Sequence, residues 1–167
     1  FVGVDENKGV SYAVITIDVK SLAENSVIKN ASFNLYPINR VSTTIEKYGE
    51  WNVGLVNQNT MGDVTEYDDV DNMEIIQYIG RPTESHQLTQ GIWRTWELSG
   101  IECKTLQDIA SKHEKVVLRV EGPKELIIGR TRQMMQWDIG YGKFGYGLTY
   151  RPRLELTYTV KPTITEL

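Results

Sequence analysis

Apolar and polar residues alternate along most of the chain with the two-residue period of a β-strand. The clearest alternating runs fall at residues 12–19, 28–36, 116–120 and 154–160. Shorter runs of the same kind fall at residues 53–56, 74–79, 92–98 and 126–128. Turn-forming pairs such as Gly122-Pro123 separate these runs, so the pattern predicts an all-β antiparallel sandwich.

One segment has the spacing of a helix instead. Leu106 and Ile109 fall on one helical face, and Asp108 follows Thr105 at the three-residue spacing of a capping box. The sequence therefore predicts one short helix over residues 105–112, crossing the end of the sandwich.

The composition fits a single domain with a full core. The chain has 167 residues, 40% of them hydrophobic, and it has no internal repeat or low-complexity tract. We expect residues 1–160 to form one domain and residues 161–167 to be a tail or linker. A net charge of −4 argues against nucleic acid as a partner, which needs a clustered basic face. The apolar runs are too short for a transmembrane helix, which argues against membrane insertion.

Catalytic motifs are missing from the sequence. The lone Cys103 is either a nucleophile or a small buried apolar residue, and the lack of a partner motif around His86 or His113 favours the second reading. No spacing singles out a pair of carboxylates for glycoside hydrolysis, and there is no nucleophile elbow or phosphate-binding loop. The sequence therefore favours a protein that is not an enzyme.

An acidic stretch is the one candidate for a metal site. Asp68, Asp69 and Asp71 could supply oxygen ligands to a structural calcium ion. The stretch lacks the glycine and the distal glutamate of an EF-hand, so a solvated acidic loop is the alternative. No other cofactor is expected.

Glycines and aromatic residues interleave over residues 137–150. Glycine permits positive φ and close approach of other chains, and aromatic rings supply flat apolar faces with a polar handle. The segment either holds a sugar ring or closes one end of the sandwich. The glycine-flanked Tyr141 and Tyr146 are the rings that we expect to be exposed, with Arg151 beside them and Trp51 on a separate loop.

The two tryptophans of residues 92–98 differ in their expected environment. Trp93 and Trp96 lie three residues apart in a predicted strand, so their side chains point to opposite faces of the sheet. We expect at least one of them to lie in the core. For each tryptophan taken separately, Trp51 included, a core position is the favoured alternative to exposure.

The order of these elements resembles the DNRLRE-type carbohydrate-binding modules. The resemblance rests on four stretches: residues 12–22, 25–36, 93–112 and 150–158, the last reading Tyr-Arg-Pro-Arg-Leu-Glu-Leu-Thr-Tyr. Ile17 stands where that family has phenylalanine before aspartate, and residues 49–82 lack a clear family signature. The resemblance implies a jelly-roll sandwich appended to extracellular enzymes, surface proteins or phage particles, with acidic or matrix polysaccharides as ligands.

The expected function is a non-catalytic module that binds a polysaccharide or cell-surface glycan, at an extracellular site or on a virion surface. Its ligand-binding candidates are Trp51, Tyr141, Tyr146 and Arg151. The alternative is a structural or assembly domain of a virion or surface fibre (a tail, fibre or capsid-decoration module) that docks to protein. An enzyme is the third reading, and it would need a cleft with convergent acids.

Overall fold

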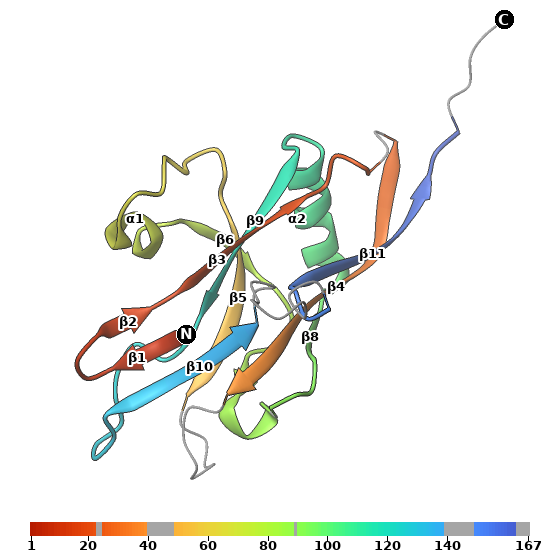
Figure 1. The fold of residues 1–167 in the computed structure, drawn as a ribbon. Helices are drawn as coiled ribbons and strands as arrows, with labels where there is room; N and C mark the ends of the chain where they lie inside the picture. The colour runs from red at the N-terminus through yellow and green to blue at the C-terminus, as the bar shows by residue number, and fades with distance from the viewer. Residues whose placement is uncertain (23–24, 40–48, 89, 139–148, 163–167) are drawn as a thin grey trace, which may run out of the picture.

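Two antiparallel β-sheets pack face to face in the computed structural model, which describes residues 1–22, 25–39, 49–88, 90–138 and 149–162 (Figure 1). The first sheet contains β1 (Val2–Asp5), β2 (Gly9–Ser11), β4 (Ser26–Asn39), β8 (Arg94–Glu97), β10 (Arg132–Asp138) and β11 (Arg153–Val160). The second contains β3 (Ala13–Asp18), β5 (Glu50–Val56), β6 (Ile75–Tyr78), β7 (Thr83–Glu84) and β9 (Lys115–Glu121). The predicted all-β sandwich is confirmed.

The strand order is that of a jelly roll. In the first sheet β4 pairs with β8, with β11 and with β10, and β10 pairs with β1. In the second sheet the order is β3–β9–β5–β6. Strands β10 and β11 pair with successive parts of β4, so we count them together as the last of eight main strands; the others, in chain order, are β1, β3, β4, β5, β6, β8 and β9. The first sheet then has the order 1-8-3-6 (β1, β10 with β11, β4, β8) and the second the order 2-7-4-5 (β3, β9, β5, β6), as in jelly-roll folds.

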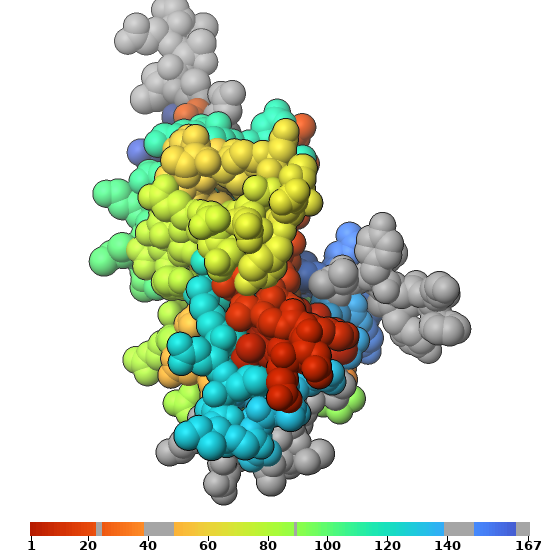
Figure 2. All heavy atoms as spheres, turned by 90° about the vertical axis from the view of Figure 1, so that its left-hand side faces the viewer, coloured from red at the N-terminus to blue at the C-terminus, as the bar shows by residue number. Residues whose placement is uncertain are grey.

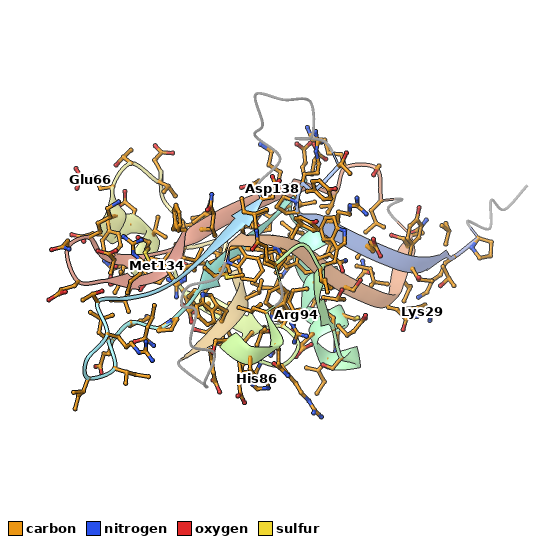
Figure 3. The ribbon with its side chains drawn as sticks, turned by 60° about the horizontal axis from the view of Figure 1, so that its bottom comes forward. Lys29, Glu66, His86, Arg94, Met134 and Asp138 are labelled. Carbon is orange, nitrogen blue, oxygen red and sulfur yellow. The ribbon has the colours of Figure 1, made fainter. Side chains whose placement is uncertain are left out.

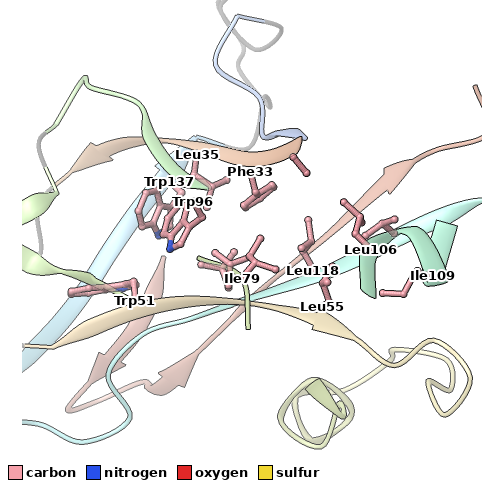
Figure 4. Close-up of a cluster of buried hydrophobic side chains, with 14 of the residues drawn as sticks. Phe33, Leu35, Trp51, Leu55, Ile79, Trp96, Leu106, Ile109, Leu118 and Trp137 are labelled. Atoms are coloured by element: carbon pink, nitrogen blue, oxygen red, sulfur yellow. The ribbon is translucent and has the colours of Figure 1, made fainter. Parts of the chain in front are cut away.

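The core lies between the sheets and is formed by the apolar face of each alternating strand. Phe33 and Leu35 of β4 pack against Trp96 and Trp137 of neighbouring strands and against Leu118 of the facing sheet (Figure 4). A smaller cluster of Val56, Met73 and Val117 lies on the outer face of the second sheet, under the β5–β6 connection. This connection, yellow to yellow-green in Figure 2, stands beside the red β1–β2 hairpin on one face of the molecule.

The longer helix begins earlier than the sequence pattern predicts. Helix α2 spans Gly100–Ala110, and its N-cap is Ser99 rather than Thr105. The Ser99 hydroxyl accepts the Glu102 N–H at 3.4 Å, and the Glu102 carboxylate accepts the Ser99 N–H at 2.7 Å. This capping box lies closer to the preceding strand and satisfies the first free N–H groups of the helix. The predicted apolar face is confirmed, since Leu106 and Ile109 are buried.

The predicted strand at residues 126–128 is wrong, because these residues belong to the β9–β10 connection. A turn holds them: the Arg130 N–H donates to the Ile127 carbonyl at 3.0 Å, and the Ile127 N–H donates to the Gln133 side chain at 2.8 Å. Two further short helices, α1 (Tyr67–Asp71) and the 3₁₀ helix η1 (Ser85–Gln87), were not predicted. None of the helices in the described ranges is long and apolar enough to cross a bilayer.

Candidate functional site

Three aromatic side chains meet on the outer face of the first sheet. The rings of Tyr36 and Tyr150 stack with centroids 4.1 Å apart and an interplanar angle of 22°. The Trp93 ring meets Tyr36 edge-on at 5.3 Å and lies 6.4 Å from Tyr150. All three side chains are half-buried, so part of each ring is open to solvent. We call Tyr36, Trp93 and Tyr150 the aromatic cluster.

Strand register brings the aromatic cluster together. Asn34 of β4 lies opposite Thr95 of β8, which places Tyr36 and Trp93 side by side two residues further along the same face. The turn before Trp93 is tied to β4 by the Gly91 N–H, which donates to the Pro37 carbonyl at 2.9 Å. Gly91 has a φ of +78°, a conformation that other residues rarely adopt, so glycine at this position fixes the approach of Trp93 to the sheet.

A guanidinium group borders the cluster. Arg153, the first residue of β11, lies with its guanidinium carbon 4.4 Å from the Trp93 ring centroid, a cation–π geometry. Its Nη2 donates to the Thr149 carbonyl at 2.7 Å. These two contacts hold the positive charge of the exposed Arg153 at the rim of the cluster.

A row of polar side chains continues from the cluster along the same face. The Thr95 hydroxyl donates to the Asn34 side chain at 2.5 Å, and the Asn34 amide donates to the Ser32 hydroxyl at 3.3 Å. Ser32 lies between Glu97 of β8 and Glu155 of β11 in the strand register. Asn34 is 8% exposed and its side chain makes both of these bonds, so the groups next to the rings are the half-buried hydroxyls of Ser32 and Thr95 and the carboxylates of Glu97 and Glu155. We call Ser32, Asn34 and Thr95 the polar row.

Two charged residues near the cluster lie on opposite faces of the first sheet. Asp138 of β10 pairs with Tyr36 on the outer face, whereas Arg94 of β8 pairs with Leu35 on the core face (Figure 3). Partial burial, then the neighbouring Tyr150 and the Asp138 carboxylate, raise the pKa of Tyr36. Its hydroxyl therefore stays protonated through neutral pH and can donate a hydrogen bond.

Trp51 was named as a ligand-binding candidate on the expectation that its ring is exposed, and the structure contradicts this exposure in favour of the alternative, a core position. Its ring is 0% exposed, and its indole N–H donates to the Val2 carbonyl at 3.0 Å. A side chain at Gly122 would come within 2.6 Å of the indole nitrogen, which shows how closely the chain packs over the ring. The alternation of β5 explains this position, because Trp51, Val53 and Leu55 share the core face.

The other predicted ligand-binding residues have different outcomes. Tyr141 and Tyr146 lie outside the described residues, so they remain predictions. Arg151 is exposed and directly follows Tyr150 of the aromatic cluster. Trp137, at the start of the glycine-rich segment, is 6% exposed and packs against Trp96 in the core. At least this end of the segment helps to close the sandwich.

The predicted calcium ligands do not converge. The stretch that contains Asp68, Asp69 and Asp71 forms helix α1 rather than the expected loop. The Asp69 carboxylate accepts the N–H groups of Thr65 and Glu66 at 2.8 and 2.9 Å, which caps this helix and lowers the pKa of Asp69. The Asp71 carboxylate accepts a hydrogen bond from the hydroxyl of Tyr12, which lies between β2 and β3. Within the described ranges, no group of three or more His, Cys, Asp or Glu side chains is arranged to hold a metal ion.

Cys103 lies in the core as a small apolar residue, with 3% of its surface exposed. Burial raises the pKa of its thiol, so the sulfur is protonated at neutral pH. This agrees with the second of the two readings of the lone cysteine.

Sequence reasoning missed Tyr36, Trp93 and Arg153 as members of one site. The period of each strand does place these residues on polar faces, since Tyr36 alternates with Leu35 and Arg153 with Leu154. The pairing of β4 with both β8 and β11 brings the three faces together, and no local pattern encodes this pairing. No protein-family model matches the chain, and the comparison with curated proteins finds no relative.

Proposed function

We propose that the protein is a non-catalytic carbohydrate-binding module that recognises a polysaccharide on the outer face of the first sheet. The observation that carries the proposal is the aromatic cluster of Tyr36, Trp93 and Tyr150 beside a guanidinium and the polar row. The resemblance to DNRLRE-type modules supports the same function. The proposed ligand-binding residues therefore include Trp93 and Tyr36 in place of Trp51, which is buried.

The chemistry of the surface suits a sugar. The C–H groups of a pyranose ring pack against an aromatic face, while its hydroxyl groups need both donors and acceptors. Trp93 supplies an aromatic ring, and Ser32 and Thr95 supply hydroxyl groups beside the carboxylates of Glu97 and Glu155. Arg151 and Arg153 add guanidinium donors at one end. Ring contacts and hydroxyl hydrogen bonds give modest affinity for a single site, and several copies would increase it.

A glycan array followed by titration calorimetry tests the proposal. For the polysaccharide that the array selects, we expect Trp93→Ala to weaken binding by about tenfold, because a lost ring contact is worth roughly 1–1.5 kcal/mol. Tyr78→Ala is the matched control, since Tyr78 is 44% exposed but lies on the outer face of the second sheet. The proposal fails if no polysaccharide binds at millimolar concentration, or if the two variants weaken binding equally.

One observation favours an assembly domain as the second candidate function. Ile127 and Ile128 are 40% and 99% exposed at the tip of the β9–β10 connection. Contiguous exposed apolar side chains mark protein-docking surfaces, and these two isoleucines are neighbours in the chain. Ile128→Ser separates the two functions, because it would leave glycan binding unchanged and would weaken only an interaction with protein.

A further inference from the structure

Two strands at one side of the sandwich have an unpaired edge. Among the described residues β11 pairs with β4 alone, and β3 of the facing sheet pairs with β9 alone. The two free edges lie on either side of a recess of about 220 Å³. Most of its lining is apolar and comes from both strands and the segment after β3: Ile17, Val19, Leu22, Leu154, Leu156 and Tyr158.

Strand β11 has few of the features that keep a free edge from pairing. Its register with β4 shifts between Thr157 and Tyr158, and the extra residue, Lys29, lies in β4 rather than in β11. Strand β11 is eight residues long, and its two prolines, Pro152 and Pro162, lie just outside it. Its core-facing side carries no charge, although inward charges and proline are common protections of edge strands. Near its end Tyr158 is 42% exposed and Val160 is 56% exposed on this same side. The strand also extends beyond the body of the sandwich (Figure 1).

We propose that β11 is the interface with a second copy of this chain. The two β11 strands pair antiparallel, with Thr157 opposite the partner's Thr157 at the two-fold axis. In this register the numbers of two opposed residues add up to 314. Each even-numbered residue, whose side chain faces the core, therefore lies opposite another even-numbered one.

The apolar side favours this register. Leu154 comes to lie opposite the partner's Val160, and Leu156 opposite the partner's Tyr158. The exposed parts of Tyr158 and Val160 are then covered by leucines that already line the recess. Directly opposed apolar side chains are the pairs that stabilise a sheet.

Charges on the other side are compatible with the same register. Glu155 lies opposite the partner's Thr159 and diagonal to the partner's Lys161, so two Glu–Lys pairs form across the axis. Arg153 lies opposite the partner's Lys161, but its guanidinium is turned away towards Trp93 and the Thr149 carbonyl. The register therefore adds opposite-charge pairs and brings no guanidinium and ammonium into contact.

The dimer joins the two first sheets edge to edge and leaves both outer faces on the same side. It would present two aromatic clusters to one polysaccharide. The inference does not depend on sugar binding, because it rests only on the edge and its residues.

An engineered disulfide tests the register. Directly opposed side chains have Cβ atoms about 4.5–5.5 Å apart, close to the distance that a disulfide needs. We expect Thr157→Cys to form a covalent dimer on mild oxidation, seen on a non-reducing gel. Thr159→Cys, whose side chain would face the partner's Glu155, is the matched control and stays monomeric on that gel. The native Cys103 is buried, so the unmodified protein shows the background.

Light scattering after gel filtration, over about a hundredfold range of concentration, tests the dimer itself. The unmodified chain and Thr159→Lys should dimerise, whereas Tyr158→Lys, at a side chain that is 42% exposed in the single chain, should be monomeric with an unchanged circular dichroism spectrum. A monomer at every concentration would overturn the proposal, as would equal dimerisation of the two lysine variants. A dimer in which Thr157→Cys does not cross-link would overturn the register.

Discussion

Arg119 joins the second sheet to the segment that covers it. Its side chain is almost fully buried on β9, where Nη1 donates to the carbonyls of Val70, Asp71 and Met73 at 2.8, 3.0 and 3.2 Å. Its Nη2 pairs with Glu121 at 2.9 Å. One residue thus satisfies the carbonyl groups at the end of α1 and neutralises a buried carboxylate.

Removing this guanidinium should be costly. We expect Arg119→Met to lower the free energy of unfolding by about 3–5 kcal/mol, because Glu121 would be left buried without its cation. Urea denaturation measures the change. Lys20→Met is the control: the ion pair of Lys20 with Glu114 is exposed, so its loss should cost less than about 1 kcal/mol. Equal effects of the two variants would contradict this role of Arg119.

Asp5 gives the stability a dependence on pH. The hydrogen bond from Arg132 at 2.6 Å, with backbone N–H groups of Asn7 and Lys8, lowers the pKa of Asp5. Because the folded pKa lies below the unfolded value of about 3.9, the ionised carboxylate stabilises the fold above that pH. This contribution is lost as the pH falls through the folded pKa.

Unfolding of Asp5→Asn at several pH values checks this prediction. The variant should be less stable than the unmodified protein at pH 7, and the difference should shrink as the pH falls below about 4. A difference that stayed constant across this range would show that the carboxylate charge does not contribute.

For single residues, the sequence predicts burial well when the bounds of the strand are predicted correctly. Trp96 and Trp93 lie on opposite faces, as their spacing of three requires. Trp51 was misplaced because the predicted strand began at residue 53, two residues after it. Extending the alternation back from Val53 would have placed its ring in the core.

The capping box of α2 determines where this element begins. Ser99→Ala removes the acceptor of the Glu102 N–H, so we expect a loss of about 1 kcal/mol in the free energy of unfolding. Thr105→Ala is the matched control within the helix, where the hydroxyl only donates to the Ile101 carbonyl and the change should be within about 0.5 kcal/mol. Thermal or urea unfolding distinguishes them. A larger loss for Thr105→Ala would mean that the helix begins where the sequence pattern had placed it.

Strands could be predicted from the sequence where the alternation of apolar residues continues over many consecutive positions. The runs that became β3, β4, β9 and β11 keep an apolar residue at every second position over several residues, and all four were predicted. Strand β1 was not predicted, because its four residues, Val2–Asp5, are too few to show a period, and the charged Asp5 among them is buried. Residues 126–128 have strand-like composition, but a turn and the Gln133 side chain satisfy their backbone instead.

The whole molecule creates the candidate site by long-range pairing. Tyr36, Trp93 and Tyr150 are separated by more than fifty residues in each step along the chain, yet the jelly-roll order makes β4 the common neighbour of β8, β10 and β11. Sequence alone could predict the sandwich and the polar faces of its strands. It could not predict which polar faces meet, because that depends on pairings between distant strands.

The most direct test of the proposed site follows the four indole N–H signals of the protein in a ¹⁵N-resolved spectrum during titration with the polysaccharide. Trp51, Trp96 and Trp137 are buried in the core, whereas Trp93 is half-buried on the outer face. The structure predicts that the Trp93 signal shifts in a saturable manner while the other three stay in place. Saturable binding that leaves the Trp93 signal unmoved would contradict the proposed site.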